Sequence, residues 1–200
     1  MKPLRKNAKY PFIHRALAKK YDKATLAVIL GKAETHYAAL AAECTGATPG
    51  EWTHLEGTIL PTAAVYKALL DVDAANALAV THEAIIALCR TGNKMLRVLL
   101  HIPGMKGLFM RLLPKMALTM FGQECGFDHA NYHADKTRLA MDMTSCPYCR
   151  YARLLGVEAL TPIFCESDFA TYGGLPGIRF ERTQTLGTGG NQCDFRFCRD

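Results

Sequence analysis

Hydrophobic and polar residues alternate at helical spacing through the first 120 residues. Lys23–Cys44 is rich in Ala and Leu, contains no Pro, and ends before the helix breaker Pro49. A second helix is predicted from Pro61, a residue type that suits the first turn of a helix. A third is predicted over Asp71–Arg90, where apolar side chains recur every three or four residues, with Gly92 following as its stop.

Two shorter helices, Met95–Ile102 and Leu108–Phe121, are predicted on either side of Pro103-Gly104. After Gly126 the pattern changes, because Thr137–Thr144 alternates between polar and apolar residues as a half-buried strand does. The remaining predicted elements are helices over Arg150–Leu155 and Ala159–Tyr172 and strands over Ile178–Leu186 and Cys193–Arg199. Glycine-rich residues 187–192 join the two strands as a hairpin.

These elements predict an α+β fold in which a helical N-terminal part packs on a small antiparallel sheet. We expect a basic N-terminal segment, residues 1–22, followed by a single domain over 23–200. That domain divides into a helical part, 23–125, and a cysteine-rich α/β part, 126–200. A chain of 200 residues that is 50% hydrophobic and 21% charged can bury a sizeable core and is not a disordered tail.

No apolar stretch approaches the roughly 20 residues that span a bilayer, and the charged N-terminus lacks the apolar run of a secretory signal. We therefore expect a cytoplasmic protein with reduced thiols. The net charge is +6, and residues 93–120 carry five basic residues and no acid. This stretch is either a solvated helix face or a peripheral membrane contact, with Met105, Phe109 and Met110 as its apolar anchors. Without a nucleic-acid-binding motif, nucleic acid is not expected as a partner, and the oligomeric state stays open.

Five of the eight cysteines crowd the last 55 residues: Cys146, Cys149, Cys165, Cys193 and Cys198. The tetrapeptide Cys-Pro-Tyr-Cys at 146–149 resembles the active site of glutaredoxins, and a helix N-terminus there stabilises a thiolate. The chain after Cys149 is too short to complete a thioredoxin-like domain. Thiol–disulfide exchange is therefore disfavoured as the main activity.

Cys165 and Asp168 lie three residues apart on a predicted helix and share a face. Cys146 follows one predicted strand and Cys193 begins another, so both can lie near that helix. Such a cluster suits a thiolate nucleophile with an acid–base partner, or a zinc site formed by Cys146, Cys165 and Cys193. The same thiols could instead be small buried hydrophobic residues.

Five blocks near the C-terminus resemble the L-2-amino-thiazoline-4-carboxylic acid hydrolase family. They are Cys146–Tyr148, Leu155–Glu158, Phe164–Phe169, Phe180–Leu186 and Cys193–Phe197, and Leu60–Leu69 resembles the N-terminal helix of the family. The resemblance implies a hydrolase that opens a cyclic amidine or isothiourea ring to an N-carbamoyl amino acid.

For that reaction Cys165, Asp168 and Cys146 are the expected catalytic residues, and Arg182 and Thr183 are expected to bind the substrate. Arg182 suits a carboxylate because its guanidinium binds two oxygens at once. No cofactor is required unless the thiols hold Zn²⁺.

A weaker likeness to vinyl-reductase-type domains leaves an alternative. This is a non-enzymatic small-molecule or zinc-binding sensor domain, with Cys165, Glu181 and Cys193 as ligands. A further metal pair, His129 and His133, would share one face if that segment were helical.

Overall fold

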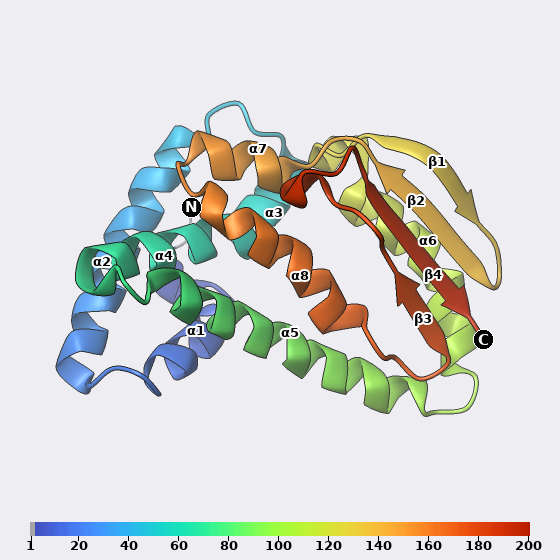
Figure 1. Ribbon diagram of the computed structural model, residues 1–200, viewed down its shortest axis with the longest axis horizontal. Coiled ribbons are helices and arrows are strands. Elements are labelled where there is room, and N and C mark those ends of the chain that lie inside the picture. The colour runs from blue at the N-terminus through green and yellow to red at the C-terminus, as the bar shows by residue number, and fades with distance from the viewer. Residues whose placement is uncertain (1–2) are drawn as a thin grey trace.

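The computed structural model describes residues 3–200 (Figure 1). Its helices are α1 (Tyr10–Leu17), α2 (Lys23–Glu43), α3 (Pro49–His54), α4 (Leu60–Asp73), α5 (Ala77–Leu100), α6 (Met105–Phe121), α7 (Pro147–Leu154) and α8 (Thr161–Tyr172). The strands are β1 (His129–Ala134), β2 (Arg138–Met143), β3 (Ile178–Glu181) and β4 (Cys193–Arg199). The α+β architecture expected from the sequence is confirmed.

The strands form one antiparallel sheet in the order β1-β2-β4-β3. Leu139 of β2 pairs with Phe197 of β4, and both are buried in a core that includes side chains of α6. Tyr172 at the end of α8 packs its ring 5.2 Å from that of Phe197. On the other face of the sheet, Arg196 pairs with Asp142 at 2.6 Å. One face is therefore apolar and covered by helices, as the alternation in the sequence predicts.

The helical part has a second core, built mainly where α2 packs against α4. The N-terminal segment contributes Leu4, Ile13 and Leu17 to it, and all three side chains are almost fully buried. Residues 3–22 thus pack into the same body as α2 and α4. No helix within residues 3–200 has both the length and the apolar character needed to cross a bilayer.

Helix α5 runs through Gly92, where the sequence suggested a stop. The side-chain amide of Asn93 donates hydrogen bonds to the carbonyls of Thr171 and Gly173, both at 2.9 Å. These bonds join α5 to the end of α8, and the packing between the two helices outweighs the low helix propensity of glycine.

Strand β3 ends at Glu181, five residues before the predicted end. The Asp194 carboxylate accepts hydrogen bonds from the backbone N–H groups of Thr183 and Gln184, both at 2.9 Å, and from the Thr183 hydroxyl at 2.6 Å. Because these amides bond to a side chain, they leave the strand ladder. The chain then turns back toward α8 through Leu186.

Candidate functional site

A cavity of about 320 Å³ lies between the helical core and the sheet core. Ile85 of α5 lines it from the helical side, and Met143 and Phe195 line it from the sheet. Tyr148 of α7 lines it too and packs against both cores. A largely apolar space with a few polar groups, placed between two packed layers, is typical of a small-molecule site.

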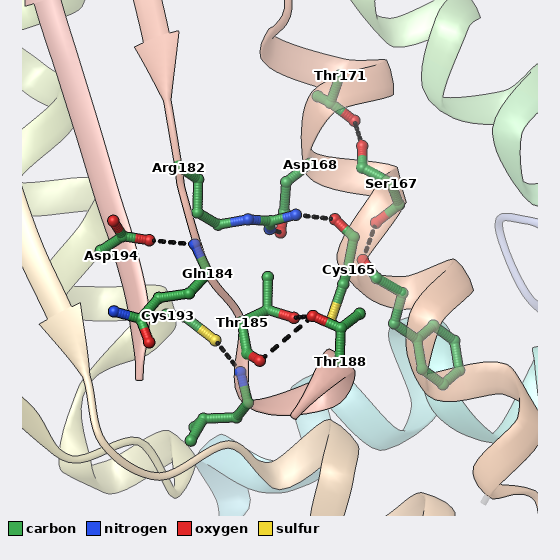
Figure 2. A network of polar contacts seen from close by, with 12 residues as sticks. Cys165, Ser167, Asp168, Thr171, Arg182, Gln184, Thr185, Thr188, Cys193 and Asp194 are labelled. Atoms are coloured by element: carbon green, nitrogen blue, oxygen red, sulfur yellow. Dashed lines mark hydrogen bonds and ion pairs between the residues drawn. The ribbon is translucent and has the colours of Figure 1, made fainter. Parts of the chain in front are cut away.

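An ion pair between α8 and the segment after β3 forms the polar centre of this cavity (Figure 2). Arg182 Nη1 donates to Asp168 Oδ2 at 2.6 Å, and its Nη2 donates to the Cys165 carbonyl at 2.8 Å. The Arg182 side chain is only 5% exposed, and its guanidinium lies over the ring of Phe169. Arg182 was expected to bind the substrate carboxylate, but in the structure both of its Nη atoms already donate to protein oxygens.

The Asp168 carboxylate is 25% exposed and lines the cavity. Burial raises its pKa to about 6, although the adjacent Arg182 acts in the opposite direction. Oδ2 holds Arg182, and no hydrogen bond within residues 3–200 uses Oδ1. Asp168 therefore presents a free oxygen to the cavity, with a pKa that suits proton transfer near neutral pH.

The expected thiols reach the same cavity: Cys146, Cys165 and Cys193 all line it, together with Cys149. Burial raises the pKa of the Cys165 thiol and raises that of Cys193 to about 11. Cys165 lies against Gly187, where an added Cβ would come within 2.6 Å of its sulfur. Cys165 is therefore a protonated, closely packed thiol at neutral pH, which disfavours it as a nucleophile.

The donor atoms expected for zinc do not converge. Within residues 3–200, no group of three or more His, Cys, Asp or Glu side chains is arranged to hold a metal ion. Glu181, the third ligand of the sensor-type alternative, is exposed and pairs with Arg179 at 2.8 Å. Neither zinc set, Cys146/Cys165/Cys193 nor Cys165/Glu181/Cys193, fits this arrangement.

Two further expectations differ from the structure. The hydroxyl and the backbone N–H of Thr183 both donate hydrogen bonds to Asp194. These two groups therefore hold the loop and do not face a ligand. His129 and His133 lie on strand β1, not on a helix, and the pairing with β2 shifts register between them. His133 instead pairs with Asp135 at 3.1 Å, so these two residues do not form the helical metal pair.

A basic residue from the N-terminal segment also lines the cavity. Lys9, the residue before α1, donates from Nζ to the Thr58 hydroxyl at 2.5 Å. Burial lowers the pKa of Lys9 to about 8. No ion pair within residues 3–200 involves Lys9. The charge of Arg182 is balanced by that of Asp168. The ammonium of Lys9 therefore gives the cavity a positive charge that a ligand anion could neutralise.

Thr58 lies in a π-helical segment, Leu55–Ile59, between α3 and α4. Such segments often occur at functional sites. Nearby, His54 Nε2 donates to the Met120 carbonyl at 2.6 Å, because a carbonyl can only accept. His54 Nδ1 then accepts from the Tyr148 hydroxyl at 3.1 Å. These bonds fix the orientation of Tyr148 beside Lys9 and Thr58 on the cavity wall.

Sequence patterns gave no signal for Lys9 or Thr58. Lys9 is one of several basic residues in its segment, and only the fold shows that it faces inward.

The family model described as L-2-amino-thiazoline-4-carboxylic acid hydrolase matches residues 52–197, a range that does not include Lys9. No curated protein and no solved structure matches the chain. Since the family model covers most of the chain, including Asp168, Arg182 and the thiols that line the cavity, the protein belongs to the L-2-amino-thiazoline-4-carboxylic acid hydrolase family.

Proposed function

We propose that the protein hydrolyses a cyclic isothiourea bearing a carboxylate, such as L-2-amino-thiazoline-4-carboxylate, to the N-carbamoyl amino acid. One observation supports this proposal independently of the family. The same cavity is lined by Asp168, which has a free carboxylate oxygen, and by Lys9, whose ammonium forms no ion pair within residues 3–200. A ring with a protonated amidine at one end and a carboxylate at the other matches the negative charge of Asp168 and the positive charge of Lys9. The apolar walls exclude water from the rest of the ring.

In this proposal Lys9 binds the substrate carboxylate, taking the role that the sequence suggested for Arg182. The Asp168 Oδ1 atom faces C2, the amidine carbon of the ring, with a water molecule between the two atoms. Arg182 holds the other oxygen of Asp168 and keeps the carboxylate from rotating. Arg182 is thus a positioning residue.

The reaction that follows needs one base. Asp168 accepts a proton from water as the water oxygen bonds to C2 of the ring amidinium, in which the ring nitrogen is already protonated. This gives an uncharged tetrahedral carbon attached to oxygen, sulfur and two nitrogens. The C2–sulfur bond then breaks as the hydroxyl proton leaves to solvent and a C=O bond forms. The departing sulfur takes the proton from Asp168. One water is consumed, the ring opens to a urea and a thiol, and the carboxylate of Asp168 is restored.

The pH dependence of turnover tests this assignment. Asp168 acts only when ionised, so kcat/KM for the thiazoline is expected to rise as pH increases through about 6. Lys9 binds a carboxylate only when protonated, so kcat/KM is expected to fall as pH increases through about 8. Mass spectrometry of the ring-opened product, with circular dichroism at each pH as a control for folding, provides the measurement. Binding of the thiazoline without turnover at any pH would instead favour the ligand-sensing alternative.

We also propose that residues 93–120 contact an anionic membrane surface. Several large apolar side chains on this stretch are exposed: Met95, Val98, Leu99, Ile102, Leu108, Leu112, Met116, Leu118 and Met120. The same stretch carries five basic residues and no acid. The apolar anchors differ from those expected from the sequence, because Met110 is fully buried and Met105 and Phe109 are only partly exposed. The like charges oppose pairing with a second copy through this face.

Co-sedimentation with phosphatidylglycerol vesicles tests this surface. We expect the protein to pellet with these vesicles and not with phosphatidylcholine vesicles, because binding needs both apolar burial and negative charge. The double variant Val98→Glu/Ile102→Glu is expected to remain in the supernatant. Val28→Glu on α2, where Val28 is 51% exposed against 52% for Ile102, is the control and should pellet as the wild type does. An equal loss of vesicle pelleting in the double variant and in Val28→Glu would contradict a lipid partner. So would sedimentation equilibrium that shows a dimer for the wild type and a monomer for the double variant.

A further inference from the structure

Cys146 and Cys149 form a dithiol at the N-terminus of α7. Cys146 is the residue that caps the helix, and Cys149 lies in its first turn. Both are free and partly exposed, and both line the cavity. The two side chains are close enough for each to shift the pKa of the other. A pair of cysteines three residues apart at a helix start brings the sulfurs close enough to bond without moving distant elements.

The surroundings make the two thiols unequal. The neighbouring Cys146 side chain lowers the pKa of Cys149 to about 7, and Arg153 acts in the same direction. The same interaction and burial raise the pKa of Cys146. The lower pKa makes Cys149 the better attacking thiol, with Cys146 beside it as the resolving thiol. The other thiols of the cavity, Cys89, Cys165 and Cys193, have raised pKa values and react more slowly.

We propose that Cys146 and Cys149 are a redox modification site, at which a small-molecule disulfide such as oxidised glutathione converts the pair to an intramolecular disulfide. The Cys149 thiolate attacks one glutathione sulfur, forms a mixed disulfide and releases one glutathione thiolate, which takes up a proton. Cys146 then loses its proton and attacks the Cys149 sulfur, releasing the second glutathione. The protein gives up two electrons and two protons, and one disulfide yields two thiols.

The modification also regulates the cavity, a consequence that rests on the hydrolase function proposed above. Bonding the sulfurs draws the Cys146 and Cys149 side chains together on the cavity wall beside Cys165 and Cys193. It also fixes the start of α7, which carries Tyr148. We expect the oxidised protein to open the thiazoline ring several-fold more slowly and to recover fully with dithiothreitol.

Peptide mass spectrometry tests the modification without any substrate. Trypsin releases residues 139–150 as one peptide that contains both Cys146 and Cys149, whereas Cys165 and Cys193 lie on separate peptides. After treatment of the intact protein with oxidised glutathione and blocking of free thiols, this peptide is expected to lose two hydrogens and to escape blocking. Persistent glutathione on Cys149, or a cross-link to the peptide of Cys165 or Cys193, would overturn the proposal.

Cys149→Ser separates modification from catalysis, because Cys149 has no role in the proposed mechanism. This variant is expected to keep wild-type turnover, to form no disulfide within peptide 139–150, and to resist oxidised glutathione. Cys44→Ser, a buried thiol of the helical core, is the matched control and should stay sensitive. A disulfide that forms without slowing turnover would refute the regulation and leave the modification site standing. Absence of the disulfide would refute the site whatever the activity.

Discussion

Asp168→Asn is expected to reduce ring opening by about 10²–10⁴-fold, the contribution typical of a positioned general base. The amide has the shape of the carboxylate, and its oxygen can still accept the hydrogen bond from Arg182. It cannot accept the proton of water. The kcat for thiazoline hydrolysis is therefore expected to fall much more than KM rises, and the rise of the rate through about pH 6 should disappear.

Cys165→Ser is the matched variant for this measurement, because Cys165 lies one helical turn from Asp168 in the same cavity. We expect it to keep most of the activity, since its thiol is protonated at neutral pH. Circular dichroism and thermal unfolding confirm that both variants fold. A loss in Cys165→Ser as large as in Asp168→Asn, together with a covalent adduct on Cys165, would assign the nucleophile to the thiol and refute direct attack by water.

Lys9→Met is expected to lower kcat/KM by roughly 10- to 100-fold, mainly through KM. A hydrogen bond between charged groups contributes about 1.5–3 kcal/mol, which corresponds to such a factor. Methionine keeps the apolar length of the side chain and removes the ammonium, which is held in a partly buried position with a lowered pKa. The variant is therefore expected to fold as well as the wild type, and the decline of the rate through about pH 8 should vanish.

Two comparisons isolate the contact with the substrate carboxylate. Lys6→Met removes a charge from the same segment at an exposed position and should leave KM unchanged. 2-Amino-thiazoline, which lacks the carboxylate, should bind wild type and Lys9→Met equally. If Lys9→Met weakens both ligands by the same factor, Lys9 supports the cavity rather than recognising the anion, and the carboxylate must be bound elsewhere.

The sequence predicted the parts of this protein that follow from local pattern. Alternation in Thr137–Thr144 indicated β2 at Arg138–Met143, and the spacing of apolar residues indicated α2 and α4. Residues three apart on a helix placed Cys165 and Asp168 together, and the cavity does contain both. In each case the determining interactions lie within a few residues of one another.

The features that could not be predicted depend on contacts between distant residues. Gly92 does not end α5, because Asn93 bonds to the far end of α8. Arg182 could be recognised as a carboxylate partner, but the sequence did not indicate that the carboxylate it holds is that of Asp168. Lys9 lies 49 residues from Thr58, and nothing in its own segment distinguishes it from the exposed lysines beside it.

A single turnover in water enriched in the heavy isotope of oxygen tests the proposed chemistry most directly. With enzyme in excess over L-2-amino-thiazoline-4-carboxylate, direct attack by water predicts that the first product molecules carry the heavy oxygen in their carbamoyl group. Attack by the Asp168 carboxylate would instead transfer an unlabelled oxygen in that first turnover. Labelled product from the wild type and almost none from Asp168→Asn would support the account. Unlabelled product, or equal product from the two proteins, would contradict it.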